Sequence, residues 1–447
     1  MAMGPEKGQA ATRQVELMVC LDELVPADDP YRTLDRLVDW SFVRGQAAPY
    51  YADEGRPSID PIVLVKLMLA GALEGIGSMR ELLRQAALRL DLRRFLGYGL
   101  HERLPVHQTL SHAQTRRFVD ATLFERIFTR TVALCREHDL LDGTHLSIDG
   151  FHTEANAALA SLRASLAEAP EPPADHPDAP ADPQPAPAQL SLCQPPVRGA
   201  QPPARRSSNA TTRSTSDPDA RLRHKPGQRP HLVYRGQVAV DPKHRCVSAC
   251  LGEQATGHEG DAIAPLVDRA RFAAPGLVSV GADCGFAAER VYADLERRGL
   301  AGYIPPQPNM LGRGALPATS SQRLARKARA RCKTGEGIWA HARRMADAEG
   351  VISELKTQGT LARARCRGRS LFHVQVLIDC AALNCKRLIK QAEGRAEGIA
   401  GAGQAAASAP TPPPPALTPP ARASASADAF DLSTANLTTW AFLVSLN

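Results

Sequence analysis

The sequence has no apolar stretch approaching the roughly 18 residues that a membrane-spanning helix requires. Its best apolar segment, residues 61–73, is interrupted by Lys66. The first ten residues contain no apolar run and do not resemble a secretory signal. From these absences we expect no membrane contact and predict a cytoplasmic protein.

Cysteine is not arranged in a disulfide or zinc pattern. The ten cysteines are scattered singly along 447 residues, which fits a reducing compartment. The nearest pair, Cys246 and Cys250, has His244 and His258 close in sequence. The spacing matches no common set of zinc ligands, and the residues between the two cysteines are typical of a strand. A zinc site here is therefore the disfavoured alternative.

Lysine is scarce: only nine of the 54 basic residues are Lys. The formal net charge of the whole chain is only +7. The positive charge is concentrated in residues 312–390, which contain 17 Lys or Arg and five Asp or Glu. Its densest parts are residues 323–333 and 363–369. Clustering of this kind is the footprint of a protein that binds phosphates of nucleic acid. The alternative is a solvated surface without a ligand.

Length and composition divide the chain into folded and proline-rich parts. With 43% apolar and 23% charged residues, the chain has the composition of a globular protein of two or three domains. Twelve prolines lie between Pro170 and Pro203 and seven between Pro410 and Pro420, and such stretches cannot build a core. We predict a disordered N-terminus (1–20), a helical domain (21–140), an α/β domain (141–390) with a disordered insert (165–217), and a disordered tail (391–447).

Signals for helix starts recur through residues 21–140. Asp29 and Asp60 each precede a proline, which places Asp at the N-cap and Pro at the first helical position. Ser78 is answered three residues later by Glu81, as in a capping box.

Around residue 110 these helices are short and polar. Thr109, Arg116 and Arg117 lie on one such segment, which a helix-turn-helix would use to contact DNA. A plain helical bundle with a polar face is the alternative.

From residue 141 onward strands appear and then alternate with helices. Residues 145–155 have the alternation of a strand, and residues 231–241 and 245–253 suggest a hairpin through Asp241 and Pro242. Further strands are expected near residues 275–286 and 299–307, with helices between and after them. The order predicts an α/β fold with a mixed sheet.

Three acidic residues stand out in this part of the chain. Asp149 lies within a strand whose neighbours are apolar, where a carboxylate is costly unless it is paired or bound to metal. Asp283 follows a strand, at the end where open α/β sheets place their ligands. On a regular helix, Glu349 lies at the rim of the apolar stripe of residues 345–355 and Lys356 shares its side. The same geometry places Asp347 and Glu354 toward solvent.

Each acid has a simpler interpretation by itself. An Asp after a strand is often only a helix N-cap, and a helix Glu often forms a surface ion pair of little worth. Together, however, three carboxylates beside a basic segment suit Mg²⁺, with Mn²⁺ as a substitute. Two such ions activate water and stabilise the leaving oxygen of a phosphodiester.

Five segments then resemble bacterial insertion-sequence transposases of the DDE class, in the order of that family. They are residues 55–82, 145–162, 217–241, 279–286 and 348–388. The first Asp block is followed by Ala155-Asn156-Ala157, the second reads Ala-Asp-Cys-Gly-Phe, and Glu349 is followed seven residues later by Lys356. Related groups often have Arg four residues before the Glu. That position is Met345 here, and Arg344 is one residue further away.

The resemblance implies an RNase H-like fold in which Asp149, Asp283 and Glu349 bind Mg²⁺ and catalyse DNA cleavage and strand transfer at the ends of a mobile element. It implies double-stranded DNA as the partner, a homodimer or larger assembly, and a nucleoid-associated location. We expect Lys356, Arg343 and Arg344 near the cut phosphate, and Arg363, Arg365 and Arg367 along the DNA. The alternatives are an RNase H-like nuclease without strand transfer and an inactive DNA-binding remnant.

Overall fold

The structure is a computed structural model that describes residues 20–51, 58–117, 121–164, 209, 212–224, 227, 229–312 and 319–407. The chain divides into a compact unit of residues 1–396 and a second unit of residues 397–447. Of the segments expected to be disordered, residues 1–19, 165–208 and 408–447 lie outside the described residues. Among the helices that are described, none is long and apolar enough to span a bilayer.

The N-terminal region is helical, as expected. It contains α1 (Leu21–Leu24), α2 (Pro30–Leu37), α3 (Ser41–Ala47), η2 (Ala48–Tyr50), α4 (Pro61–Leu73), α5 (Met79–Leu88), α6 (Leu90–Leu96), α7 (His107–His112), the π turn η3 (Ala113–Arg117) and α8 (Thr122–Glu137). Asp29 and Asp60 accept hydrogen bonds from the first turns of α2 and α4, which confirms both N-caps. Ser78 accepts from Glu81 N, but the Glu81 carboxylate binds Arg84 and Gln85, so only half of the capping box forms.

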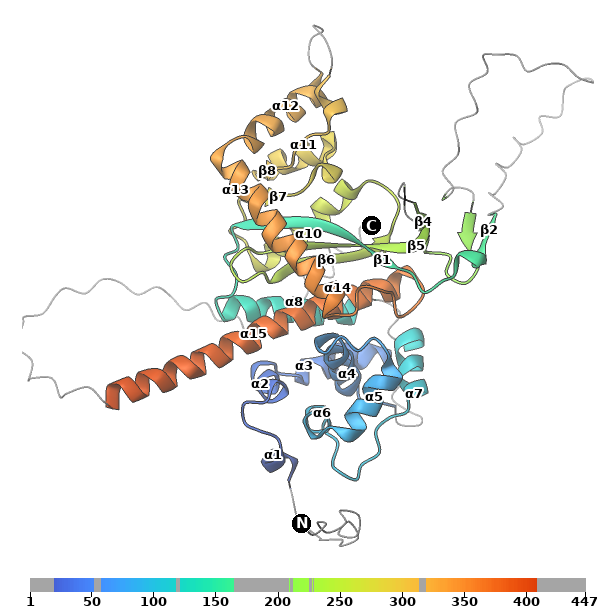
Figure 1. The fold of residues 1–447 in the computed structure, drawn as a ribbon, viewed down its shortest axis with the longest axis vertical. Coiled ribbons are helices and arrows are strands. Elements are labelled where there is room, and N and C mark those ends of the chain that lie inside the picture. The colour runs from blue at the N-terminus through green and yellow to red at the C-terminus, as the bar shows by residue number, and fades with distance from the viewer. Residues whose placement is uncertain are drawn as a thin grey trace, which may run out of the picture. The chain divides into compact units, whose positions relative to one another are not determined.

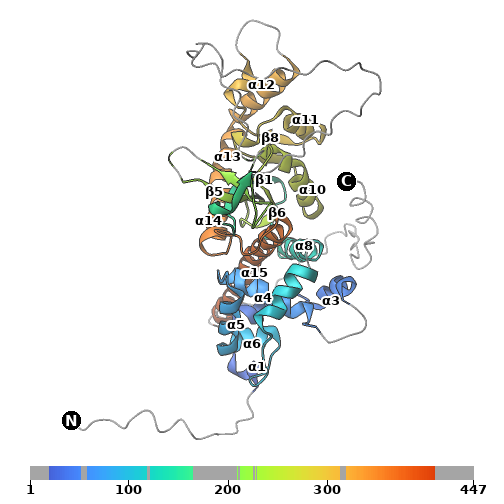
Figure 2. The same cartoon turned by 90° about the vertical axis from the view of Figure 1, so that its right-hand side faces the viewer.

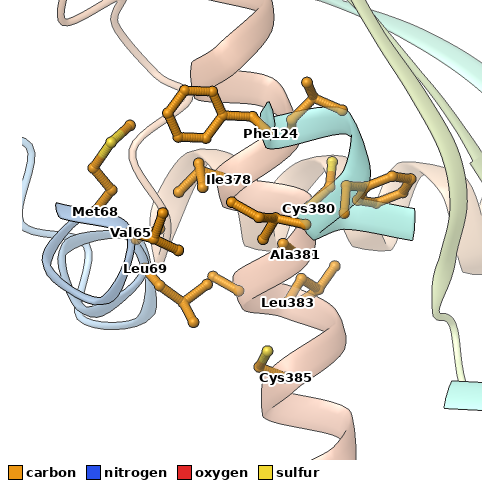
Figure 3. Close-up of a cluster of buried hydrophobic side chains, with 14 of the residues drawn as sticks. Val65, Met68, Leu69, Phe124, Ile378, Cys380, Ala381, Leu383 and Cys385 are labelled. Carbon is orange, nitrogen blue, oxygen red and sulfur yellow. The ribbon is translucent and has the colours of Figure 1, made fainter. Parts of the chain in front are cut away.

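Helix α4 joins this region to the C-terminal helix. It is apolar around most of its circumference and almost fully buried, as expected of a helix inside a core. Figure 3 shows Val65, Met68 and Leu69 of α4 gathered with Phe124 of α8 and Ile378 of α15 (Arg369–Ala407). The helical region and α15 therefore share one hydrophobic core.

The α/β region is built on a mixed sheet, as the strand order predicted. Its strands are β1 (His145–Glu154), β4 (Arg221–Arg223), β5 (His231–Val240), β6 (Val247–Gln254), β7 (Ser279–Gly281) and β8 (Ala301–Tyr303). Strand β1 pairs antiparallel with β5 and parallel with β7, and β7 pairs parallel with β8. Strand β5 also pairs antiparallel with β4 and β6, which confirms the predicted hairpin.

The expected insert begins and ends in a small ladder. After η4 (Leu159–Ser161), strand β2 (Leu162–Ala164) pairs antiparallel with β3 (Thr212–Ser214). The prediction that residues 165–217 lack regular structure is therefore wrong for 212–214. This end contains no prolines before Pro218, so its backbone is free to donate to a ladder.

Alternate residues of β1 face two different layers of helices. Leu146 and Ile148 pack in a core with η5 (Glu259–Ala262), α10 (Ile263–Ala273), α11 (Glu289–Arg297) and α12 (Ser320–Cys332). Phe151 joins the core that contains α14 (Gly350–Thr357) and α15. Figure 1 shows α13 (Gly335–Arg344) and α14 running across the strands, and Figure 2 shows α14 and α10 on opposite sides of them.

Helix α15 continues beyond the expected end of the domain. Disorder was predicted after Gln391, but the helix runs to Ala407. Residues 391–407 contain seven Ala, the residue of highest helix propensity, and the helix tolerates four interspersed Gly.

Candidate active site

Asp149 lies near the middle of β1, opposite Val238 of β5. Its side chain is only 13% exposed, and its Oδ1 accepts a hydrogen bond from Gly150 N at 2.8 Å. Because strand residues two apart share a face, Asp149 lies on the same side as Phe151, beneath α13 and α14. This position explains why a carboxylate occurs among buried neighbours: its side chain faces the helix layer that carries the other polar groups.

Asp283 lies just beyond the carboxyl end of β7. It caps η6 (Cys284–Phe286), and its Oδ1 accepts a hydrogen bond from Gly285 N at 2.9 Å, so the simple N-cap interpretation is part of its role. Strands β1 and β7 are parallel, and Ser147 pairs with Gly281, two residues before each acid. Both aspartates therefore lie at the same edge of the sheet, as predicted for a ligand site.

Glu349 reaches the same place through Arg344. Nη1 of Arg344 lies 2.6 Å from Asp149 Oδ2, and Nη2 lies 3.2 Å from Glu349 Oε1. Arg344 is buried, whereas the Glu349 side chain is 51% exposed. The guanidinium thus connects the strand acid to the helix acid across the edge of the site.

A π turn, η8 (Met345–Glu349), makes this arrangement possible. In a π turn the repeat lengthens from four residues to five, so a residue five positions before another shares its face. Arg344 therefore lies beside Glu349 although it precedes it by five residues, and the position four residues before Glu349 is Met345. Such turns are common at functional sites.

The π turn also overturns part of the helical phase expected from the sequence. Met345 is 50% exposed although it was assigned to the apolar stripe, and Asp347 is 2% exposed although it was assigned to solvent. The extra residue rotates the segment before Glu349 relative to α14. Glu354 was also expected in solvent, but its half-buried carboxylate pairs with Arg387 of α15 at 2.6 Å.

The carboxylates influence one another. The pKa of Asp149 is raised to about 6, chiefly because burial disfavours its charged form. The nearby charges of Asp283 and Glu349 act in the same direction, while the Gly150 N–H and Arg344 oppose them. A site that holds a carboxylate at this cost is suited to a cation.

The donor chemistry fits Mg²⁺, since all three predicted ligands offer hard carboxylate oxygens. The present arrangement is not yet a metal cage, because within the described residues no three His, Cys, Asp or Glu side chains converge closely enough to hold an ion. Arg344 is the cation that Asp149 and Glu349 share instead. The Cys246 and Cys250 pair forms no such group either.

Two further residues were expected near the cut, and the structure gives them different surroundings. Lys356 Nζ lies 5.6 Å from the centre of the Phe151 ring, on the Asp149 side of β1. Burial lowers the pKa of Lys356, with the charge of Arg223 acting in the same direction. Arg343 points elsewhere, because it donates to Pro242 O and pairs with Asp347 at 2.8 Å.

The three arginines expected along DNA have different surroundings. Arg363 is exposed, and Arg367 is exposed while its Nε donates to Asn156 O. Arg365 is mostly buried, and its guanidinium binds Asp379 at 3.2 Å and Thr360 Oγ1 at 2.8 Å. Arg365 is therefore engaged inside the fold, a difference that its place in a basic run did not reveal.

The residues expected in a helix-turn-helix lie apart from the acidic site. Thr109 is exposed on α7, and Arg116 and Arg117 belong to the π turn η3 that follows it. The structure therefore brings together Asp149, Asp283, Glu349 and Arg344. It places Lys356 farther along β1, beside Phe151 and Arg223, and leaves Thr109, Arg116 and Arg117 in the helical region.

A fourth acid, Glu259, escaped sequence reasoning. A Cβ placed on Gly285 would lie 2.5 Å from Glu259 Oε2 and 3.0 Å from Asp283 Oδ1, so both carboxylates border the same glycine. Only glycine leaves this space open. In the sequence Glu259 is one acid in a loop after a strand, and no local signal distinguishes it.

Two segments of the chain match family models. Residues 19–116 match a transposase domain (DUF772), and residues 313–389 match a transposase DDE domain. The resemblance to insertion-sequence DDE transposases is confirmed. The first transposase match covers α1–α7, and the second contains Glu349 and Lys356 but neither Asp149 nor Asp283. No curated protein and no solved structure matches the chain.

Proposed function

We propose that this transposase cleaves and joins DNA at the ends of a mobile element, using Asp149, Asp283 and Glu349. The observation that supports the proposal is that β1, β7 and η8 meet at one edge of the sheet. Asp283 and Glu349 are there close enough to influence the pKa of Asp149, and Arg344 pairs with both Asp149 and Glu349. A central strand with the first Asp, a neighbouring strand end with the second and a following helix with the Glu also support an RNase H-like fold.

The three carboxylates would hold Mg²⁺, or Mn²⁺ in its place. When bound, the metal supplies activation of a nucleophile and stabilisation of charge at a phosphodiester. The protein's own part is to orient the three acids and to exclude competing contacts. Arg344 forms ion pairs with both Asp149 and Glu349, and it would have to release them for the metal. Released in this way, Arg344 would be free to bind phosphate oxygens, and Lys356 is a further proposed phosphate contact on the same side of β1.

Double-stranded DNA is the proposed partner, both as the ends of the element and as the target, and the proposed assembly is a homodimer or larger. After cleavage, a 3′ hydroxyl attacks the target in line. Two alternatives remain distinct from this proposal. A nuclease would hydrolyse DNA without joining it, and inverted repeats flanking the gene would argue against it. A DNA-binding remnant would bind the ends but not cut them.

The test is nicking and joining of a labelled duplex that carries the flanking repeats, with Mg²⁺. We expect Asp149→Asn, Asp283→Asn and Glu349→Gln to abolish nicking while DNA binding persists, because phosphate contacts come from Arg and Lys. Glu137→Gln is the matched control, since its side chain is 52% exposed, close to the 51% of Glu349, and it lies on α8. Nicking by the Glu349 variant at the rate of the control would contradict the assignment.

A further inference from the structure

A strongly basic cavity lies on the other side of the helix turn that carries Arg344. It has a volume of about 650 Å³ and lies between the β5–β6 hairpin, the region of α13 and η8, and α15. Six basic side chains line it: Lys243, His244, Arg245, Arg343, Arg387 and Lys390. Asp347 is the only acidic residue among the lining residues.

Pairing within the protein leaves part of this charge uncompensated. Lys243 pairs with Asp139 at 2.7 Å, Arg343 with Asp347 at 2.8 Å, and Arg387 with Glu354 at 2.6 Å. No carboxylate in the described part of the chain pairs with Arg245 or with Lys390, and both are exposed. A cavity with two unmatched cations beside three matched ones attracts an anion.

The backbone holds Arg245 in place at a cost. Its φ of 56° is in the left-handed region, where hairpin turns usually have Gly, Asn or Asp. Strain of this kind concentrates at ligand-binding positions. The Arg245 guanidinium also comes within 3.0 Å of where a Cβ on Gly350 would lie, and Gly350 directly follows Glu349. The cavity is therefore connected to the turn that carries the proposed catalytic glutamate.

We infer that this cavity binds a phosphate of the DNA strand other than the phosphate that is cut. The inference rests on the proposed function for the identity of the DNA, but it concerns a separate contact. Arg245 and Lys390 provide the positive charge. Arg343 also lines the cavity, and it belongs to the helix turn beside the active site. Backbone phosphates carry no sequence information, so the contact positions the DNA and does not select its sequence.

The experiment measures binding of a fluorescent duplex of arbitrary sequence to the full chain, in EDTA, across a salt series. Arg245→Gly and Lys390→Gln each remove one charge, and Arg297→Ala removes one from an exposed ion pair on α11 as the matched control. Each lost phosphate contact lowers the slope of log Kd against log salt by about 0.9, so the affinity change between about 50 and 200 mM salt shrinks by about threefold.

We expect this shallower slope in both variants and an unchanged slope in the control. Arg245→Gly relieves the left-handed backbone, so its melting temperature should not fall, which separates lost contact from lost folding. Slopes equal to that of the wild type in both variants would overturn the inference. A second result would overturn the inference in favour of a small phosphate ligand. In that case inorganic pyrophosphate would stabilise the wild type but not the variants, and the variants would keep the wild-type slope of log Kd against log salt. Because EDTA prevents metal-dependent nicking, this result is independent of the test of catalysis.

Discussion

The surroundings of Arg365 predict that its removal destabilises the fold before it affects DNA binding. Asp379, its partner, has no exposed side-chain surface. The carboxylate of Asp379 accepts from Thr360 N at 2.6 Å and from Thr360 Oγ1 at 2.8 Å, in addition to Arg365. Burial raises the pKa of Asp379, while Arg365 and the Thr360 hydrogen bonds oppose that rise.

Removing one partner of a buried ion pair costs about 3–5 kcal/mol, because the other charge remains buried. The two groups of Thr360 still bind Asp379 in an Arg365→Ala variant, so we expect the lower end, about 3 kcal/mol. For about 350 folded residues, that corresponds to a fall of about 4 °C in melting temperature. Arg363→Ala is the matched control: its side chain is exposed, and the change should stay within about 0.5 kcal/mol.

The assay is chemical denaturation of both variants, of Asp379→Asn and of the double variant, which together form a double-mutant cycle. We expect Arg365→Ala to cost much less in the Asp379→Asn background, because no buried charge is left unpaired. Two results together would refute this reasoning. Arg365→Ala would be as stable as Arg363→Ala, and it would reduce the dependence of DNA affinity on salt by as much as Arg363→Ala does. Arg365 would then be a free phosphate ligand, as its place in the basic run suggests.

Two further predictions concern stability. Because the pKa of Asp149 is raised, the folded protein without metal keeps a proton on Asp149 at pH values where the unfolded chain has lost it. The free energy of unfolding should therefore fall as the pH rises from about 4 to about 6, by at most about 3 kcal/mol. Denaturation across this pH range should show that fall reduced in Asp149→Asn, and an equal fall in both proteins would contradict the burial argument. Gly75 and Gly97 both have positive φ, so replacing either with Ala should cost about 1–2 kcal/mol of stability. Gly75→Ala should destabilise the protein more than Gly97→Ala, because a Cβ at Gly75 would also lie 2.7 Å from Gln358 O. Equal melting temperatures of these two variants would show that the contact between Gly75 and Gln358, which follows α14, is not tight.

Local chemistry in the sequence was sufficient for most of the helices and strands and for part of the site. Asp-Pro pairs marked the starts of α2 and α4, alternation marked β1, and the turn at Asp241 and Pro242 marked the hairpin. These signals depend on neighbours a few residues away, so the sequence displays them directly. The positions of Asp149 and Asp283 followed from the same rules, because a strand's direction determines which edge its end reaches.

Tertiary contacts decided the rest, because they join residues that are far apart in the chain. Arg365 differs from Arg363 only through Asp379 and Thr360, which a basic run of sequence cannot reveal. Glu259 meets Asp283 only across Gly285.

The phase of the proposed catalytic helix was also beyond the sequence. A regular helix places Met345 inside and Asp347 outside, and the π turn reverses both and moves Arg344 beside Glu349. The sequence by itself determined which residues could form the site, since residue type and local periodicity are written in it. Only the tertiary structure decided which of them meet. The extra residue of the π turn rotates the preceding helical residues, and that turn is stabilised by packing against the rest of the fold, which no local sequence pattern encodes.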